Sequence, residues 1–306
     1  MLPQLPASQA VAAPCESVAE WWRRHRTIAR EHADPIHQAI VGGFAADRVG
    51  WAFASGYQAA LRALFADAPG DRICALCVTE ADGNSPTAIR SSLKKNGAGW
   101  ILNGAKRWTT LGPEGALFFV AARDEAASAA RPAIKLVKLP SGSPGLKIES
   151  MPPTKFVPEV PHARLQFEDL RIEEAQILPG DGYASYVKPF RTVEDIHVQA
   201  AVLSYLMREG QRLGWPQDWL ERLSALIAAL GKLSDMPASH AETHIALAGA
   251  LAIGAGLIGE TEEFWKRSAT DPAALRWARD RELLKVAGSA REQRTKRAWE
   301  ALRQAD

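Results

Sequence analysis

The sequence predicts an α+β protein built from three successive parts: N-terminal short helices, a middle antiparallel β-sandwich or barrel domain, and a C-terminal four-helix bundle. Apolar residues recur with the helical period at both ends of the chain. Between residues 73 and 172 this period gives way to short extended runs separated by turn residues. We therefore place the parts at residues 1–70, 71–180 and 181–306.

The first part reads as two or three short helices. A helix start is indicated at Ser17, a capping residue, with Glu20 three residues later. Pro35 then ends or restarts the helix, since proline is tolerated only in the first turn.

The middle part contains seven candidate strands. They are short extended runs divided by turn residues. This density of strands is typical of an antiparallel sandwich or barrel. The seven runs cover residues 73–80, 92–97, 99–110, 116–123, 133–140, 145–151 and 163–172.

The helical period returns at about Tyr183. The first long helix is expected to break at Gly214, which Trp215 and Pro216 follow, and three more helical segments cover residues 217–233, 241–268 and 271–304.

The apolar run Ile245–Gly259 has 15 residues, fewer than the roughly 20 needed to cross a bilayer. We expect no membrane span, but a buried helix whose small residues allow close packing.

The charge and cysteine content of the chain indicate which partners and ligands to expect. The chain has 37 basic and 35 acidic residues and no basic run, so nucleic acid is not expected. Three cysteines fit a reducing compartment and predict a cytoplasmic protein. Cys74 and Cys77 are spaced C-x-x-C, but in a strand residues three apart point to opposite faces, which suits neither a redox nor a metal pair. His240 and His244 share a helix face without a third ligand, so no metal site is predicted.

Two motifs in the middle part carry a family resemblance. Residues Thr79–Pro86 read Thr-Glu-Ala-Asp-Gly-Asn-Ser-Pro, and residues Leu102–Thr110 read Leu-Asn-Gly-Ala-Lys-Arg-Trp-Thr-Thr. The acyl-CoA dehydrogenase family has Thr-Glu-Pro-x-x-Gly-Ser-Asp after the first strand of its middle domain and Leu-Asn-Gly-x-Lys-x-Trp-Ile-Thr on a later strand. With the order of its three parts, the chain resembles this family, well over residues 73–186 and loosely elsewhere.

The resemblance implies a bound FAD at the end of the first strand. Main-chain groups of Cys77 and Val78 and the hydroxyl of Thr79 would bond the edge of the ring. Trp108 would stack beside the ring and Thr110 would address N5. Since alternate residues of a strand share a face, both are expected to reach one ligand. In the alternative interpretation Trp108 is a core residue and Thr79 caps a turn.

The resemblance also implies a reaction. The family removes an α-proton and a β-hydride from an acyl thioester, with the hydride passing to flavin N5. Ser85 matches a family position near the acyl-CoA and is the candidate substrate contact. The partners implied are an acyl-CoA or similar thioester and further copies of the same chain, as a homodimer or larger homo-oligomer.

The catalytic base departs from the usual pattern. Most members have Tyr-Glu-Gly-Thr near the last helix, where this chain has Ala287 in place of the glutamate. A minority place the base on the first helix after the β domain, and Glu194 stands there. Alternatively, Glu194 is a solvated residue that pairs with Arg191, while Asp195 faces roughly 100° away.

The motifs that hold the FAD nucleotide in the family are absent. These are Arg-x-x-Phe-Gly after the first bundle helix and Gln-x-x-Gly-Gly-x-Gly before the last one. Two hypotheses therefore remain open: an FAD-dependent acyl-CoA dehydrogenase-like oxidoreductase, or a catalytically inactive member that acts as a binding or partner subunit.

Overall fold

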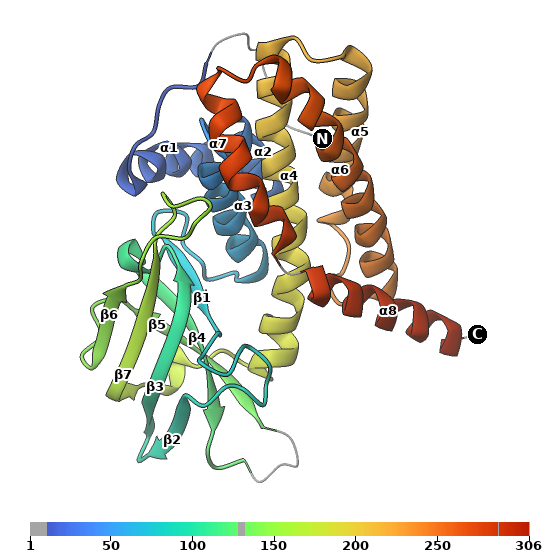
Figure 1. Cartoon of the computed structure of the whole chain (residues 1–306). Coiled ribbons are helices and arrows are strands. Elements are labelled where there is room, and N and C mark those ends of the chain that lie inside the picture. The colour runs from blue at the N-terminus through green and yellow to red at the C-terminus, as the bar shows by residue number, and fades with distance from the viewer. Residues whose placement is uncertain (1–10, 128–131, 287, 306) are drawn as a thin grey trace. The chain divides into compact units, whose positions relative to one another are not determined.

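The computed structural model describes residues 11–127, 132–286 and 288–305 (Figure 1). Contacts divide the chain into two compact units. The helical unit comprises Met1–Ala63, Lys155–Glu159 and Thr192–Asp306, and the β unit comprises Leu64–Thr154 and Val160–Arg191. Both ends of the chain therefore contribute to one helical unit, which also includes five residues from the middle of the sequence.

Three helices open the chain: α1 (Val18–Glu31), α2 (Pro35–Ala45) and α3 (Val49–Leu64). The predicted start of α1 is confirmed, since Ser17 Oγ accepts a hydrogen bond from the Glu20 N–H. Helix α2 begins at Pro35, preceded by Asp34, whose carboxylate accepts from the Ile36 N–H. Local capping chemistry thus fixes where both helices begin.

Small residues allow α2 and α3 to pack closely against α4 (Lys188–Leu213). A Cβ atom on Gly43 would overlap the backbone carbonyl of Ala201. One on Gly56 would lie 2.7 Å from the Cα of Val198. Any side chain at these two positions would therefore push the helices apart.

The C-terminal part differs from the prediction in its last element. Helix α4 ends at Leu213, before the predicted break. The predicted helix over residues 271–304 is divided, because α7 ends at Asp280, whose fully buried carboxylate accepts from Arg279 and from the Val157 N–H. A 3-10 turn (Arg281–Lys285) follows. After α4, the described residues form α5 (Gln217–Leu233), α6 (Ala241–Arg267), α7 (Pro272–Asp280) and α8 (Gly288–Ala305).

Helix α6 is less buried than expected. Close packing through a small residue holds at Gly254, where a Cβ would lie 2.6 Å from the Gln199 side chain. The expectation of close packing is wrong for Gly249, Gly256 and Gly259, because a Cβ atom added at any of these positions would have no neighbouring atom within 4 Å. Among the described residues, α6 is the one helix long and apolar enough to cross a membrane, with a mean hydropathy of 1.5 in a window that is 28% buried. Length and composition alone do not separate a spanning helix from a bundle helix, so the absence of a span stays a prediction.

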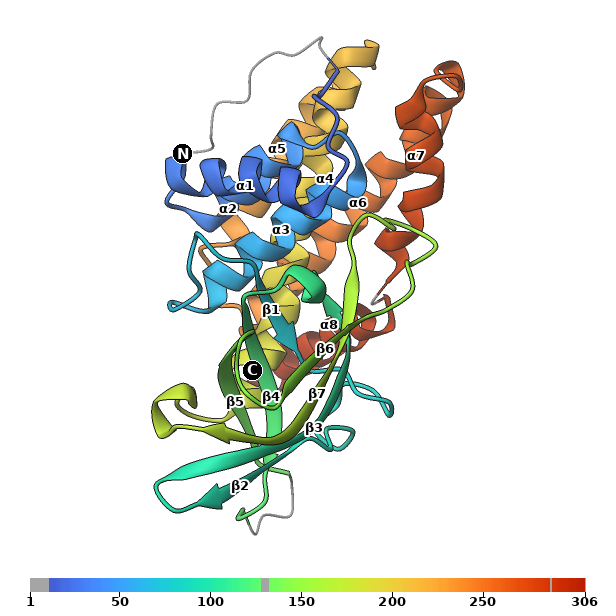
Figure 2. The ribbon, with the colours of Figure 1, turned by 90° about the vertical axis from the view of Figure 1, so that its left-hand side faces the viewer.

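The β unit contains all seven predicted strands, which form one sheet in the order β1-β4-β2-β3-β7-β6, with β5 paired to β4 (Figure 2). Most pairs are antiparallel, as predicted, but β4 runs parallel to β1 and to β2. The hairpin of β2 and β3 lies between β1 and β4 in the sequence. Because its two strands run in opposite directions, the chain returns as β4 in the direction of β1. The strands are β1 (Cys74–Cys77), β2 (Ser92–Asn96), β3 (Gly99–Thr110), β4 (Leu117–Asp124), β5 (Ile134–Pro140), β6 (Leu146–Ser150) and β7 (His162–Ile172).

Candidate functional site

The two sequence motifs meet in the β unit. Strand β1 ends at Cys77, and the chain then runs beside the second half of β3, where the carbonyl of Thr79 accepts a 2.8 Å hydrogen bond from the Arg107 N–H. The carbonyl of Val78 accepts from Lys106 Nζ at 3.4 Å. The strand-end loop and the later motif are therefore joined by direct hydrogen bonds.

A buried ion pair fastens this junction. Lys106 Nζ lies 2.5 Å from Glu80 Oε1, and the exposed fractions of the two side chains are 0% and 8%. The Glu80 carboxylate also accepts from the backbone N–H groups of Arg90 and Ser91. A carboxylate buried this deeply is stable only when it is paired and hydrogen-bonded, as it is here. The pair thus holds the loop after β1 against β3.

The protonation state of Glu80 follows from these contacts. Burial acts to raise the pKa of the carboxyl, but the Lys106 ammonium and the two backbone N–H donors outweigh it, so the pKa lies below its usual value. Glu80 is therefore ionised at neutral pH, and its lowered pKa makes it a weak base.

Trp108 sits on a β-bulge. The register of β3 with β7 shifts between Lys106 and Thr109, and Trp108 has the left-handed φ of 58°. Regular alternation along β3 was expected to place Trp108 and Thr110 on one face of the strand. This reasoning is wrong, because the extra residue of the bulge breaks the two-residue period. A positive φ is uncommon for a bulky side chain and costs on the order of 1–3 kcal/mol, and such strain clusters at functional sites.

Neighbouring side chains hold the Trp108 indole in place although it is 47% exposed. Its ring packs edge-to-face on His162, with the ring centroids 5.9 Å apart. Its backbone N–H donates to the Met151 sulfur at 3.4 Å. His162 is the cross-strand partner of Thr110, so Trp108 and Thr110 both lie next to this one residue. An exposed aromatic ring with a fixed orientation is suited to stacking against a flat ligand.

Main-chain donors lie close by. Within the described part of the chain, the N–H groups of Val78 and Thr79 donate to no other main-chain group. Thr79 and Thr110 are both half-buried. Two N–H groups, two hydroxyls and an exposed indole, from the segment after β1 and from β3, can therefore address a planar, hydrogen-bonding ligand.

The other two predicted residues of the β unit are engaged locally. The side chain of Cys77 is in the apolar core, where burial raises the pKa of its thiol to about 12, so that only its main chain is available to a ligand. Ser85 is exposed, and its Oγ accepts from the Ala88 N–H at 3.3 Å and lies 3.0 Å from Thr87 Oγ1. These bonds form a turn.

Glu194 belongs to the helical unit and is half-buried in α4. The next residue, Asp195, is buried and accepts from two guanidinium groups of α8: Arg291 Nη2 at 2.7 Å and Arg294 Nη2 at 2.8 Å. Ala287, which replaces the usual glutamate, lies outside the described residues. Glu194 is thus less buried than Asp195, as expected for neighbours that point about 100° apart on a helix.

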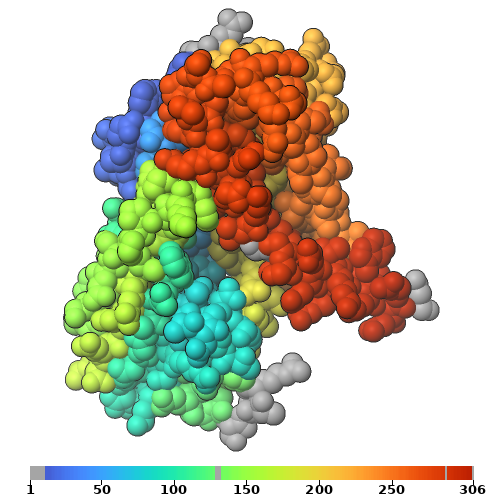
Figure 3. Space-filling model, in the orientation of Figure 1, coloured from blue at the N-terminus to red at the C-terminus, as the bar shows by residue number. Residues whose placement is uncertain are grey.

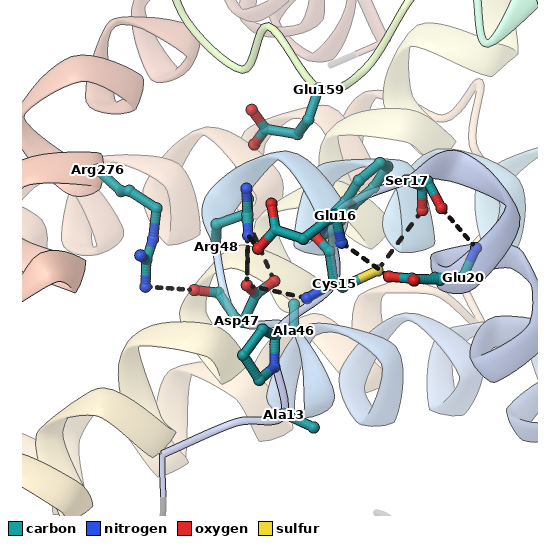
Figure 4. Close-up of polar contacts among 12 residues, drawn as sticks. Ala13, Cys15, Glu16, Ser17, Glu20, Ala46, Asp47, Arg48, Glu159 and Arg276 are labelled. Atoms are coloured by element: carbon teal, nitrogen blue, oxygen red, sulfur yellow. Dashed lines mark hydrogen bonds and ion pairs between the residues drawn. The ribbon is translucent and has the colours of Figure 1, made fainter.

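A second buried carboxylate of the helical unit is structural. Asp47 accepts from the Arg48 guanidinium at 2.7 Å and from the Cys15 N–H at 3.3 Å, and Arg276 donates to its backbone carbonyl (Figure 4). These bonds attach the segment before α1 to the turn between α2 and α3. Of the described His, Cys, Asp and Glu side chains, no group of three or more could hold a metal ion.

Sequence reasoning assigned no role to Lys106, Met151 or His162. The sequence could have identified Lys106. It lies an even number of residues after Trp100 and Leu102, which are buried, so strand alternation predicts that its side chain also points inward. A buried lysine needs a partner of opposite charge. No signal identified Met151 or His162, since both act through a bulge whose position the pattern does not give.

Comparisons with known proteins agree with these motifs. The family model "Acyl-CoA dehydrogenase, middle domain" matches residues 75–170. The 3-sulfinopropanoyl-CoA desulfinase of Paraburkholderia xenovorans is 26% identical over 139 residues, which make up 44% of this chain and 36% of that relative. The match thus spans little more than a third of the relative's length.

Solved structures share the fold over nearly the whole chain. Butyryl-CoA dehydrogenase from Megasphaera elsdenii superposes with a TM-score of 0.71 at 14% identity, covering 92% of this chain and 90% of that one. An FAD complex of PigA gives 0.59 at 16% identity, covering 92% and 84%. Residues 75–170 thus match the middle domain of the acyl-CoA dehydrogenase family, and the chain has the fold of a solved acyl-CoA dehydrogenase over most of its length.

Proposed function

We propose that the protein is an FAD-dependent oxidoreductase that dehydrogenates an acyl thioester between its α and β carbons. The observation that carries this proposal is the junction of β1 and β3, where a fixed, exposed indole lies beside unpaired main-chain donors. The family match over residues 75–170 covers this junction.

The residues of the junction fit the ring system of a flavin. An isoalloxazine has a flat face and hydrogen-bond acceptors along one edge, and these correspond to Trp108 and to the N–H groups of Val78 and Thr79. The Thr79 and Thr110 hydroxyls add donors without an acid–base group of their own. Bound FAD would supply the hydride acceptor of the reaction. The absent nucleotide motifs predict weaker FAD binding than the junction alone would suggest.

Glu194 is the proposed base. A carboxylate positioned beside the α carbon can take the α-proton of a thioester. Glu194 is half-buried, whereas Asp195 is occupied by two arginines and cannot take this role. Ser85, exposed in the loop after β1, is the proposed substrate contact.

Reconstitution with FAD tests the cofactor. We expect the purified chain to bind FAD, seen as a flavin absorbance spectrum that stays with the protein through gel filtration. Trp108→Ala should weaken binding about tenfold or more. Leu275→Ala is the control, since Leu275 is 67% exposed and lies in the helical unit outside both proposed sites. Equal FAD affinity in both variants would remove Trp108 from the site.

Anaerobic titration with a panel of acyl-CoAs tests the reaction. A substrate should bleach the flavin of the reconstituted protein, and Glu194→Gln should abolish bleaching while the flavin stays bound. Unchanged bleaching in this variant would exclude Glu194 as the base.

The second candidate is a catalytically inactive member that serves as a binding or partner subunit. It is favoured by Ala287 at the usual position of the glutamate and by the missing nucleotide motifs. A colourless protein that cannot be reconstituted with FAD would support it over the first.

We also propose a homodimer or larger homo-oligomer. The open face of α6, with Ile253 exposed, is an apolar surface that a second copy could cover. Light scattering coupled to gel filtration would measure the mass, and a monomer at micromolar concentration would contradict the proposal.

A further inference from the structure

Helices α6 and α8 of the helical unit pack against each other (Figure 1). A groove lies between them. Its volume is about 440 Å³, within the size range of small-molecule sites. Figure 3 shows α8, in red, at the surface of the molecule. The groove is lined by Ala248 and Leu251 of α6 and by Arg291, Glu292, Arg294, Thr295, Lys296 and Trp299 of α8.

The groove carries an excess of positive charge. Its lining has three cations and one carboxylate. The whole of α8 has five basic residues and two acidic ones. A concave surface with this imbalance attracts anions.

Asp195 orients two of the cations from behind the groove. Arg291 donates to Asp195 Oδ1 through Nε at 2.9 Å and through Nη2 at 2.7 Å, and Arg294 donates to Oδ2 at 2.8 Å. One carboxylate therefore serves two guanidinium groups, which leaves a net positive charge. Arg291 is 29% exposed and Arg294 is 12% exposed, so both are held in place and Arg291 still reaches solvent. A guanidinium group has five N–H donors, so Arg291 keeps donors for a phosphate beside those it gives to Asp195 and to the Leu284 carbonyl.

Trp299 lies at the other end of the same face. Arg291, Thr295 and Trp299 follow at intervals of four residues, so they share one side of α8 over roughly 12 Å. The Trp299 ring is 48% exposed and offers a stacking surface. The cationic end and the aromatic end thus lie about one small molecule apart.

We propose that this groove binds a phosphate ester that carries a flat ring, such as a nucleotide. The phosphate contacts Arg291 and Lys296, and the ring stacks on Trp299. The site lies entirely within the helical unit and does not depend on the flavin proposal.

Calorimetric titration of the full chain with adenosine 5′-monophosphate tests this site. We expect saturable binding that weakens with salt, because the phosphate contributes an ionic contact. Adenosine alone and inorganic phosphate alone should each bind at least tenfold more weakly than the nucleotide. Lys296→Ala and Trp299→Ala should each reduce the affinity about tenfold, and both side chains are exposed enough for the variants to fold.

Two controls separate this groove from other sites. Arg297→Gln removes an exposed cation of α8 outside the groove and should leave the affinity unchanged. Trp108→Ala should also leave it unchanged, which separates this site from the proposed flavin site. Absence of nucleotide binding at millimolar concentration, or equal affinity in Lys296→Ala, Trp299→Ala and the unmodified chain, would overturn the proposal.

Discussion

Each unit buries a carboxylate against positive charge, and the two arrangements differ in their access to water. In the β unit, Glu80 and Lys106 form a one-to-one pair that is almost fully enclosed. In the helical unit, Asp195 is shared by Arg291 and Arg294, both of which retain some exposure. The first arrangement is closed and electrically balanced, and the second is open on one side and positively charged.

This difference separates a structural role from a binding role. A closed and balanced pair has no donor left for a ligand, so it can only hold the backbone around it, here the loop after β1. An open cluster with excess charge keeps donors that a ligand can use. By this criterion the Glu80–Lys106 pair supports the junction of β1 and β3, the proposed flavin site, without touching the ligand, whereas Arg291 lines the proposed nucleotide site.

The largest expected effect comes from opening the closed pair. Lys106→Met removes the cation and leaves Glu80 buried without a partner, which should lower the free energy of unfolding by about 3–5 kcal/mol. Urea unfolding followed by circular dichroism measures this. Lys94→Met on β2 is the control, since Lys94 is exposed and should change stability by less than about 0.5 kcal/mol. Similar losses in the two variants would show that the pair is not a structural element.

A smaller effect is expected in the open cluster. Asp195→Asn removes a shared charge, but solvent reaches part of the arginines, so the loss should be about 2 kcal/mol. Asp218→Asn, which breaks an exposed pair with Arg222, should cost less than about 0.5 kcal/mol. If Asp195→Asn destabilised the protein as much as Lys106→Met, the distinction between open and closed would fail.

The order of parts and the strands could be predicted because each depends on local pattern. The cap at Ser17, the proline at the start of α2 and the break after Leu213 act over a few residues, and all three are found where the sequence placed them. The division after α7 could not be predicted, because it depends on Asp280 bonding to Val157, which is 123 residues away in sequence. The parallel pairing of β4 likewise depends on how a distant segment returns to the sheet.

The candidate site was predictable in part for the same reason. The two motifs predicted that Thr79 and Trp108 belong to one site, and the structure links their two segments through the hydrogen bond from the Arg107 N–H to the Thr79 carbonyl. The orientation of Trp108 was not predictable, since it depends on a bulge and on contacts with His162 and Met151 from elsewhere in the β unit. The Asp195 cluster was missed because its partners lie 96 and 99 residues away on α8.

The smallest expected effect is the pH dependence of the closed pair. The pKa of Glu80 is lowered in the folded protein, so its contribution to stability is complete above the unfolded value of about 4.3 and is lost as pH falls through the folded pKa. In Lys106→Met the same carboxyl is buried without a cation, which raises its pKa, so protonation relieves the cost. Acidification therefore lowers the stability that Glu80 gives to the unmodified chain and also lowers the cost of burying Glu80 in Lys106→Met. The difference in unfolding free energy between the unmodified chain and Lys106→Met should therefore shrink steadily from pH 7 to pH 3, as a series of urea unfolding curves would measure. A difference that stays constant over this range would mean that Lys106 stabilises the β unit through the packing of its aliphatic stem and not through its charge.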